Sequence, residues 1–192
     1  MKFFWLCFVP LFVAVDAIGV LPMFMGFTQD MDSRRIRGIL YQSVFTAIAV
    51  ALIFLAGGTA LLKLLGITVS DFMIAGGILL FVISMSDLLS TEKRQRKIDP
   101  DNLGAVPLGV PLITGPAVLT TSILLMNEYG FVLTALAVVV NILIAGFIFS
   151  LAGPINQILG RAGAKTLSKI ASLLLAAIAV MIVRKGIMAL MA

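Results

Sequence analysis

The sequence contains no histidine and only one cysteine, Cys7, among its 192 residues. Structural zinc sites are built mostly from histidine and cysteine, and a lone cysteine cannot close an intramolecular disulfide. We therefore expect no bound metal, no cofactor and no stabilising disulfide. Charged side chains are also scarce, at 12% of the residues against about 25% in an average soluble domain, which excludes an ordinary soluble protein.

Apolar side chains make up 61% of the residues, and the mean hydropathy is +1.16. Six apolar runs have the length that an α-helix needs to cross a bilayer, and none alternates like a barrel strand. The sequence therefore predicts an all-α polytopic membrane protein with six transmembrane helices. The predicted spans are residues 3–28, 39–65, 72–89, 103–126, 131–152 and 167–190.

The first apolar run also has features of a secretory signal peptide. Lys2 precedes it, and the small residues Val15 and Ala17 flank Asp16 as they would a cleavage point. However, apolar sequence continues without a gap to Phe27, and cleavage would remove half of a motif that recurs later in the chain. We therefore interpret this run as a span that is retained.

Two of the six predicted spans are interrupted near their centres. One contains VAVDAIGVLP at residues 13–22, and the other contains VPLITGPA at residues 110–117. Proline removes a backbone hydrogen bond and glycine relaxes the backbone, so we predict helix breaks around Pro22, Pro111 and Pro116. The alternative is that these residues only kink two tilted helices, because glycine and proline are frequent in membrane helices.

A shift of 96 residues places Gly19 on Gly115, and the same shift places Ile74-Ala75 on Ile170-Ala171. Several matches at one shift favour an internal duplication with three spans in each copy. Because three is odd, the second copy crosses the membrane in the opposite sense, as in the inverted repeats of secondary transporters. We predict a first three-helix repeat at residues 1–92, a cytoplasmic linker at 93–102 and a second, inverted repeat at 103–192.

The basic residues are distributed unevenly between the two sides of a six-span chain. The connections at residues 29–38, 91–102 and 153–169 carry ten lysines and arginines, whereas the other side carries four. Loops rich in Lys and Arg stay on the cytoplasmic side, so we expect both termini outside a cytoplasmic (inner) membrane. This topology accounts for the formal charge of +5 without a nucleic-acid partner.

Two broken helices that face each other are expected to enclose a cavity, because irregular backbone at membrane depth must be covered by protein or face water. Half-helices that begin after the breaks would direct free N–H groups to the midplane from both sides. Helix N-termini attract anions, so a substrate carboxylate is a suitable ligand. The candidate substrate-binding residues at the breaks are Asp16, Ala17, Ile18, Gly19, Thr114, Gly115 and Ala117.

Asp16 is the acidic residue nearest to the middle of a span. It either binds a substrate ammonium group or a coupling cation, or it caps the second half-helix by accepting its N–H groups. Gly76 and Ser172, which the shift pairs, give close helix packing or contact the substrate. Asn141 needs a partner inside the bundle, which is either a neighbouring helix or the substrate.

These motifs resemble those of a known family. DAIGVLP at residues 16–22, IAGG at 74–77 and PLGVPLITGPA at 107–117 are similar to the MarC family of prokaryotic inner-membrane proteins, within the broader group that includes the LysE exporters. The similarity runs from Leu11 to Gly186, and Ala17 and Ala117 depart from the usual D-P-I-G and G-P-G motifs. The resemblance implies a transporter, because archaeal relatives are similar to transporters of small neutral amino acids such as glycine and alanine.

We therefore expect a secondary transporter for small neutral amino acids and not an enzyme, with a proton or a sodium ion as the candidate coupling ion. The alternatives are an exporter of another small metabolite or drug, and a non-transporting membrane scaffold. A thiol-based electron carrier is excluded, because neither predicted break contains a cysteine. The expected partners are an amino acid substrate and the lipid bilayer, and a homo-oligomer is left open.

Overall fold

The computed structural model of the chain describes residues 2–28, 31–89 and 103–191, and all regular secondary structure in these residues is helical. Five helices are long and apolar enough to cross a membrane, and the count is six if one bent pair forms a single span. The predicted fold class, an all-α membrane protein, is confirmed. The helices are α1 (Lys2–Val15), α2 (Ala17–Thr28), α3 (Ser33–Leu65), α4 (Val69–Leu89), η2 (Gly104–Ile113), α5 (Pro116–Tyr129), α6 (Phe131–Ser150) and α7 (Ala152–Met191).

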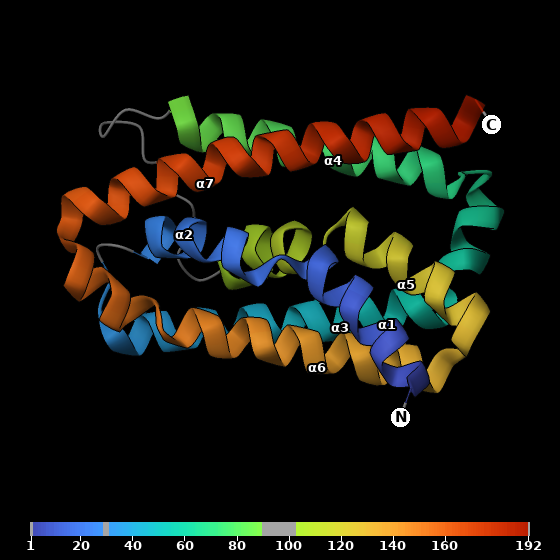
Figure 1. Cartoon of the computed structure of the whole chain (residues 1–192), viewed down its shortest axis with the longest axis horizontal. Helices are drawn as coiled ribbons and strands as arrows, with labels where there is room; N and C mark the ends of the chain where they lie inside the picture. The colour runs from blue at the N-terminus through green and yellow to red at the C-terminus, as the bar shows by residue number, and fades with distance from the viewer. Residues whose placement is uncertain (1, 29–30, 90–102, 192) are drawn as a thin grey trace.

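Most of the helices run roughly along one direction in three layers, and the first part of α7 crosses one end of the bundle from one outer layer to the other (Figure 1). One layer consists of α4 and α7, which pack against each other, and the opposite layer consists of α3 and α6. The two interrupted segments, α1 with α2 and η2 with α5, lie between these layers and contact both of them. α1 begins and α7 ends at the same end of the bundle (Figure 1), as expected for six crossings.

Polar residues set the ends of the long helices. Thr68 and Asp71 form a reciprocal cap at the start of α4, since the Thr68 N–H donates to Asp71 Oδ2 (2.9 Å) and the Asp71 N–H donates to Thr68 Oγ1 (3.1 Å). At the end of α3, Gly66 adopts a left-handed conformation (φ 68°) and donates its N–H to the carbonyls of the last turn. This turn returns the chain to the bundle as α4.

Two predicted connections are helical over much of their length. α3 begins at Ser33, so Arg34, Arg35 and Arg37 lie on its first turns instead of in a loop. α7 begins at Ala152 and includes the predicted connection at residues 153–169, with one interruption at Gly160 (φ 65°, ψ 176°). The predicted connections were placed where the hydropathy falls, and low hydropathy shows only that a segment lies outside the hydrocarbon core. A helix can continue into such a polar segment, as α3 and α7 do here. The predicted linker at 93–102 lies outside the described residues.

The core of the bundle joins the interrupted segments to the outer layers. Cys7 and Leu11 of α1 are fully buried, and so is Phe24 of α2. The Phe24 ring stacks on Phe149 of α6, with ring centroids 5.1 Å apart. Because both halves of the first span are anchored in this way, the residue that joins them is held at a fixed place inside the bundle.

Candidate functional site

The first break consists of a single residue, Asp16, between α1 and α2. Asp16 has a φ of 45°, and it is the only non-glycine residue with a positive φ in the described part of the chain. Its Oδ1 accepts a hydrogen bond from the Gly19 N–H at 3.2 Å, so it caps the N-terminus of α2. Aspartate suits this position, because it tolerates the left-handed region better than most residues and supplies the capping oxygen.

Gly19 lies inside the first turn of α2 and is itself helical. A Cβ atom at this position would overlap the Asp16 side chain, with Asp16 Cγ at 2.8 Å and Oδ1 at 2.9 Å. Glycine is therefore required here to make room for the carboxylate. The sequence predicted that Gly19 lies in the break. The break instead lies at Asp16, three residues earlier, because Asp16 adopts the non-helical backbone conformation that separates α1 from α2.

Pro22 does not break the helix as predicted, since it lies inside α2 and is buried. A proline in a helix removes one hydrogen bond and clashes with the preceding turn, but it does not by itself end the helix when packing holds both sides. The neighbouring residues Met23 and Phe24 are buried in the core, which holds α2 together on the C-terminal side of the proline.

The second break separates η2 from α5, and the two helices differ in direction by 54°. Gly115 precedes the first helical residue, Pro116, in an extended conformation (φ −85°, ψ 179°), as the predicted half-helix requires. η2 is irregular, because Val106 and Val110, each before a proline, have non-helical backbone angles, and wide turns link Leu103 to Leu108 and Gly109 to Thr114.

The second break is held in place by its neighbours in the outer layers. Thr114 is fully buried, and its Oγ1 donates a hydrogen bond to the Ala47 carbonyl of α3 at 3.0 Å. On the other side, the ring of Pro116 lies directly against Gly76 of α4, where a Cβ atom would overlap the ring. The irregular backbone is thus covered by protein on two sides.

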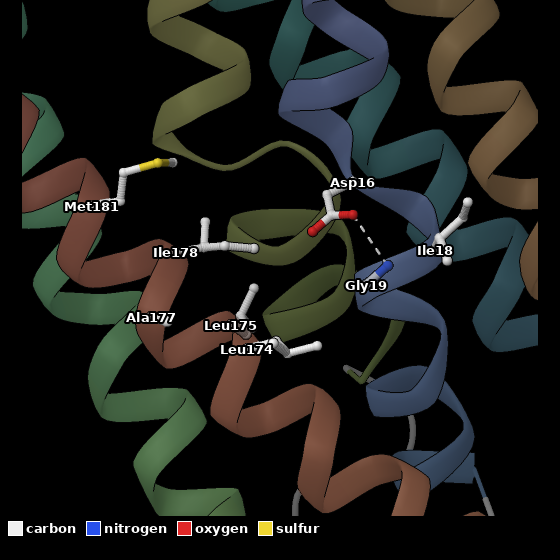
Figure 2. A pocket seen from close by; sticks show the side chains of 8 residues that line it. All are labelled: Asp16, Ile18, Gly19, Leu174, Leu175, Ala177, Ile178 and Met181. Carbon is white, nitrogen blue, oxygen red and sulfur yellow. Dashed lines mark hydrogen bonds between the residues drawn. The ribbon is translucent and has the colours of Figure 1, made fainter.

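A cavity of about 500 Å³ lies beside the first break, between α2 and α7 (Figure 2). One of the two Asp16 carboxylate oxygens is held by the Gly19 N–H, and the other points across the cavity toward α7 (Figure 2). Among the described residues, Asp16 is the only one with an ionisable side chain that lines it. The lining residues are Asp16, Ile18, Gly19, Leu174, Leu175, Ala177, Ile178 and Met181.

Of the predicted site residues, Asp16, Ile18 and Gly19 line this cavity. The second break holds a separate set, in which Thr114, Gly115 and Ala117 flank Pro116, whose ring contacts Gly76, while Ala17 is buried at the start of α2. Neither Asn141 nor Ser172 lines the cavity. The structure therefore places the predicted residues in two neighbouring groups and leaves two of them elsewhere.

Asn141 joins α6 to α1, because its Nδ2 donates to the Phe8 carbonyl (3.2 Å) and to the Ala137 carbonyl (2.9 Å). Its buried Oδ1 has no hydrogen-bond partner. Ser172 is buried in α7 and donates to the Ser168 carbonyl of its own helix at 2.8 Å. The sequence left open whether Asn141 contacts a neighbouring helix or the substrate, and the structure shows a contact with the neighbouring helix α1.

The sequence did not identify the α7 side of the cavity. These residues are apolar and lie in a membrane span, where lipid-facing residues have the same composition. The available signal was their spacing, because Leu174, Ile178 and Met181 recur at the three- and four-residue intervals that place side chains on one helix face. In residues 2–28, 31–89 and 103–191, no three acidic or thiol side chains gather in a way that would hold a metal ion.

Comparison with known proteins places these features in a family. The sequence profile described as MarC family integral membrane protein matches residues 1–191. A UPF0056 membrane protein from Archaeoglobus fulgidus is 33% identical, with 97% of this chain and 93% of the relative covered. A UPF0056 membrane protein from Methanocaldococcus jannaschii is 32% identical, with 99% and 89% covered. No solved structure shows a significant match to the chain.

Proposed function

We propose that the chain is a secondary transporter, starting from the premise that it belongs to the MarC family of integral membrane proteins. The observation that carries this proposal is the cavity beside Asp16, where a carboxylate lies at a helix break in the middle of a membrane span. Ionisable residues at this depth are costly and typically belong to substrate or ion pathways. A break of this kind is also the usual place of a transporter's binding site.

The packing of the helices supports an inverted repeat. If residues 1–92 are exchanged with residues 103–192, the contact of α2 with α7 becomes the contact of α5 with α4. The contact of α1 with α6 becomes that of η2 with α3, and the contacts α4 with α7 and α3 with α6 map onto themselves. A pseudo-two-fold axis between the halves would give this pattern and would allow the two halves to rock against each other.

The proposed substrate is a small neutral amino acid, the class implied by the family resemblance. Asp16 Oδ2 would pair with the ammonium group, since the other oxygen is already bound by the Gly19 N–H. No residue of α5 lines the cavity, so the substrate carboxylate would reach beyond the lining to the N-terminus of α5, which has no side-chain cap and would attract an anion. A proton or a sodium ion would be the coupling ion, and the membrane would be the cytoplasmic membrane with both termini outside.

A second candidate function is the export of another small metabolite or drug. The observation in its favour is the lining of the cavity, in which every side chain except that of Asp16 is apolar. Drug-sized ligands occupy cavities of about 300–1,000 Å³ with mainly apolar walls, and the volume of about 500 Å³ lies in that range. The two functions share Asp16 and differ in the apolar part of the ligand.

Counterflow in proteoliposomes tests the proposal. Vesicles loaded with unlabelled alanine should accumulate labelled alanine in a manner that depends on the protein, and an imposed proton or sodium gradient should change the extent. Loading with an amphipathic cationic antibiotic tests the second function in the same vesicles. If neither solute exchanges and neither shifts the thermal unfolding midpoint, the result contradicts transport and favours a scaffold.

A further inference from the structure

The cavity beside Asp16 has its mouth between α2 and α7, near the middle of two membrane spans. Three apolar side chains at this mouth are exposed: Ile18 (67%), Leu174 (57%) and Met181 (37%). The candidate spans that contain them are Phe3–Thr28 and Thr166–Met191, and the three residues lie well inside those spans. At this depth an exposed apolar side chain faces acyl chains, because the hydrocarbon core of a bilayer is about 30 Å thick.

We propose that the seam between α2 and α7 is a lateral entrance through which an amphipathic organic cation reaches Asp16 from the bilayer. This inference rests on the proposed function and deepens its second candidate, the export of another small metabolite or drug, because it assigns an access route and a ligand class to the same cavity. Ile18, Leu174 and Met181 at the mouth carry no polar group that would attract a solute from water, so this mouth suits a ligand that arrives through the lipid.

The lining determines the class of ligand. The carboxylate oxygen of Asp16 that points across the cavity matches a cationic head group, because a charge in apolar surroundings needs an opposite partner (Figure 2). The walls formed by Leu175 and Ile178 match an apolar body attached to that head group. A fatty acid would place two carboxylates together, and a neutral alcohol would leave the charge of Asp16 unpaired. A primary alkylamine meets both requirements.

The lateral entrance can be tested with a single tryptophan at the rim. Trp5 is the only tryptophan of the chain, so Trp5→Phe combined with Leu174→Trp gives one reporter at the mouth. We expect lipids brominated at mid-chain to quench its fluorescence and aqueous iodide to leave it unchanged. Leu173→Trp in the same background is the reference, because Leu173 is 59% exposed on the same helix and does not line the cavity. Quenching by iodide, without quenching by brominated lipid, would overturn the entrance.

The ligand class can be tested by binding of labelled decylamine to the protein in nanodiscs, with empty nanodiscs subtracted. We expect saturable binding that weakens about tenfold or more in Asp16→Asn, which removes the charge and keeps a capping oxygen. Leu174→Trp should reduce binding by filling the mouth, whereas Leu173→Trp should leave it unchanged. Decanol and decanoate should not bind saturably. Equal decylamine binding in wild type, Asp16→Asn and Leu174→Trp would contradict the inference.

The same preparations separate this inference from the proposed function. Alanine counterflow without saturable decylamine binding would overturn the inference and leave amino acid transport in place. Saturable decylamine binding that requires Asp16, without counterflow of any amino acid, would support the inference and contradict the amino acid substrate.

Discussion

The ring of Pro116, the first residue of α5, lies directly against Gly76 of α4, so closely that a methyl group on Gly76 would overlap ring carbons. This contact fixes where the second half-helix begins, because the proline ring is rigid and the glycine belongs to the neighbouring span. The contact also places α4 beside the second break, while α7 lies beside the first. The two outer helices thus each support one of the breaks.

Gly76→Ala should destabilise the protein, because the added methyl group has no free space beside Pro116. Overpacking of this kind costs about 1–3 kcal/mol. Gly57→Ala is the matched control, since Gly57 is also helical and no atom lies within 4 Å of a Cβ built there. The control should be neutral or raise stability by up to about 1 kcal/mol through helix propensity. Thermal unfolding in detergent measures both, and equal midpoints for the two variants would contradict the close contact.

Hydropathy was sufficient to predict the fold class and the approximate positions of the long apolar helices, because a bilayer requires about 20 apolar residues per helix. The positions of the breaks were less accessible. The shift of 96 residues aligned Gly19 with Gly115, whereas the residues that precede the two half-helices, Asp16 and Gly115, lie 99 positions apart. Glycine and proline in a sequence indicate where a helix can break, because one is flexible and the other rigid. Nothing in the sequence indicates that Asp16 adopts a positive φ and forms the first break.

The candidate site was predictable only on the side that carries polar or small residues. Asp16 stood out because a carboxylate in an apolar run is rare. Leu174 and Ile178 did not, because an apolar residue that lines a cavity and one that faces lipid look the same in a sequence. Asn141 was assigned a partner inside the bundle, and its contact with Phe8 could not be derived without the arrangement of α1 against α6.

Thr114→Val should weaken the second break without changing the volume of the side chain greatly. It removes the hydrogen bond from Thr114 Oγ1 to the Ala47 carbonyl and leaves that carbonyl with one partner fewer. We expect a loss of about 0.5–1.5 kcal/mol of stability, whereas Thr114→Ser, which keeps the hydroxyl group, should lose less. Unfolding of the two variants under identical conditions provides the measurement. A threonine hydroxyl without a structural role would leave the valine variant as stable as the serine variant.

Gly19→Ala should displace the Asp16 carboxylate, because the added Cβ would occupy the space of that side chain. We expect binding or transport that depends on Asp16 to be lost, although alanine has the higher helix propensity. Gly38→Ala is the control, since no atom lies within 4 Å of a Cβ at that helical position and it should retain activity. Full activity of the Gly19 variant in the counterflow assay would show that the carboxylate does not need its present position.

The orientation in the membrane rests on the ten basic residues of one side against four on the other. Alkaline phosphatase and green fluorescent protein fusions should place Asp32 and Gly163 in the cytoplasm and the C-terminus outside. α1 begins and α7 ends at the same end of the bundle, so the N-terminus should lie on the same side as the C-terminus (Figure 1). A fluorescent fusion after Ala192, together with an inactive phosphatase fusion there, would reverse the orientation and leave the fold unchanged.

Substitution of Asp16 separates its role as a cap from its role in binding. The Gly19 N–H donates to Asp16 Oδ1, so the capping role is present in the structure, and the other oxygen is left for a ligand. Asp16→Ala removes the cap and puts a residue with a Cβ and no capping oxygen at a φ of 45°. We expect it to cost about 0.5–2 kcal/mol from the cap, with an added cost from the backbone.

Asp16→Asn is the more informative variant, because asparagine accepts the same N–H group and tolerates the same backbone conformation. It should keep most of the thermal stability of the wild type. If the negative charge binds an ammonium group or a coupling cation, the variant should lose transport or its dependence on the ion gradient. We expect this outcome, because a neutral cap would have sufficed for α2 and a charge at this depth is expensive. Wild-type counterflow with unchanged ion dependence in Asp16→Asn would instead reduce Asp16 to a cap.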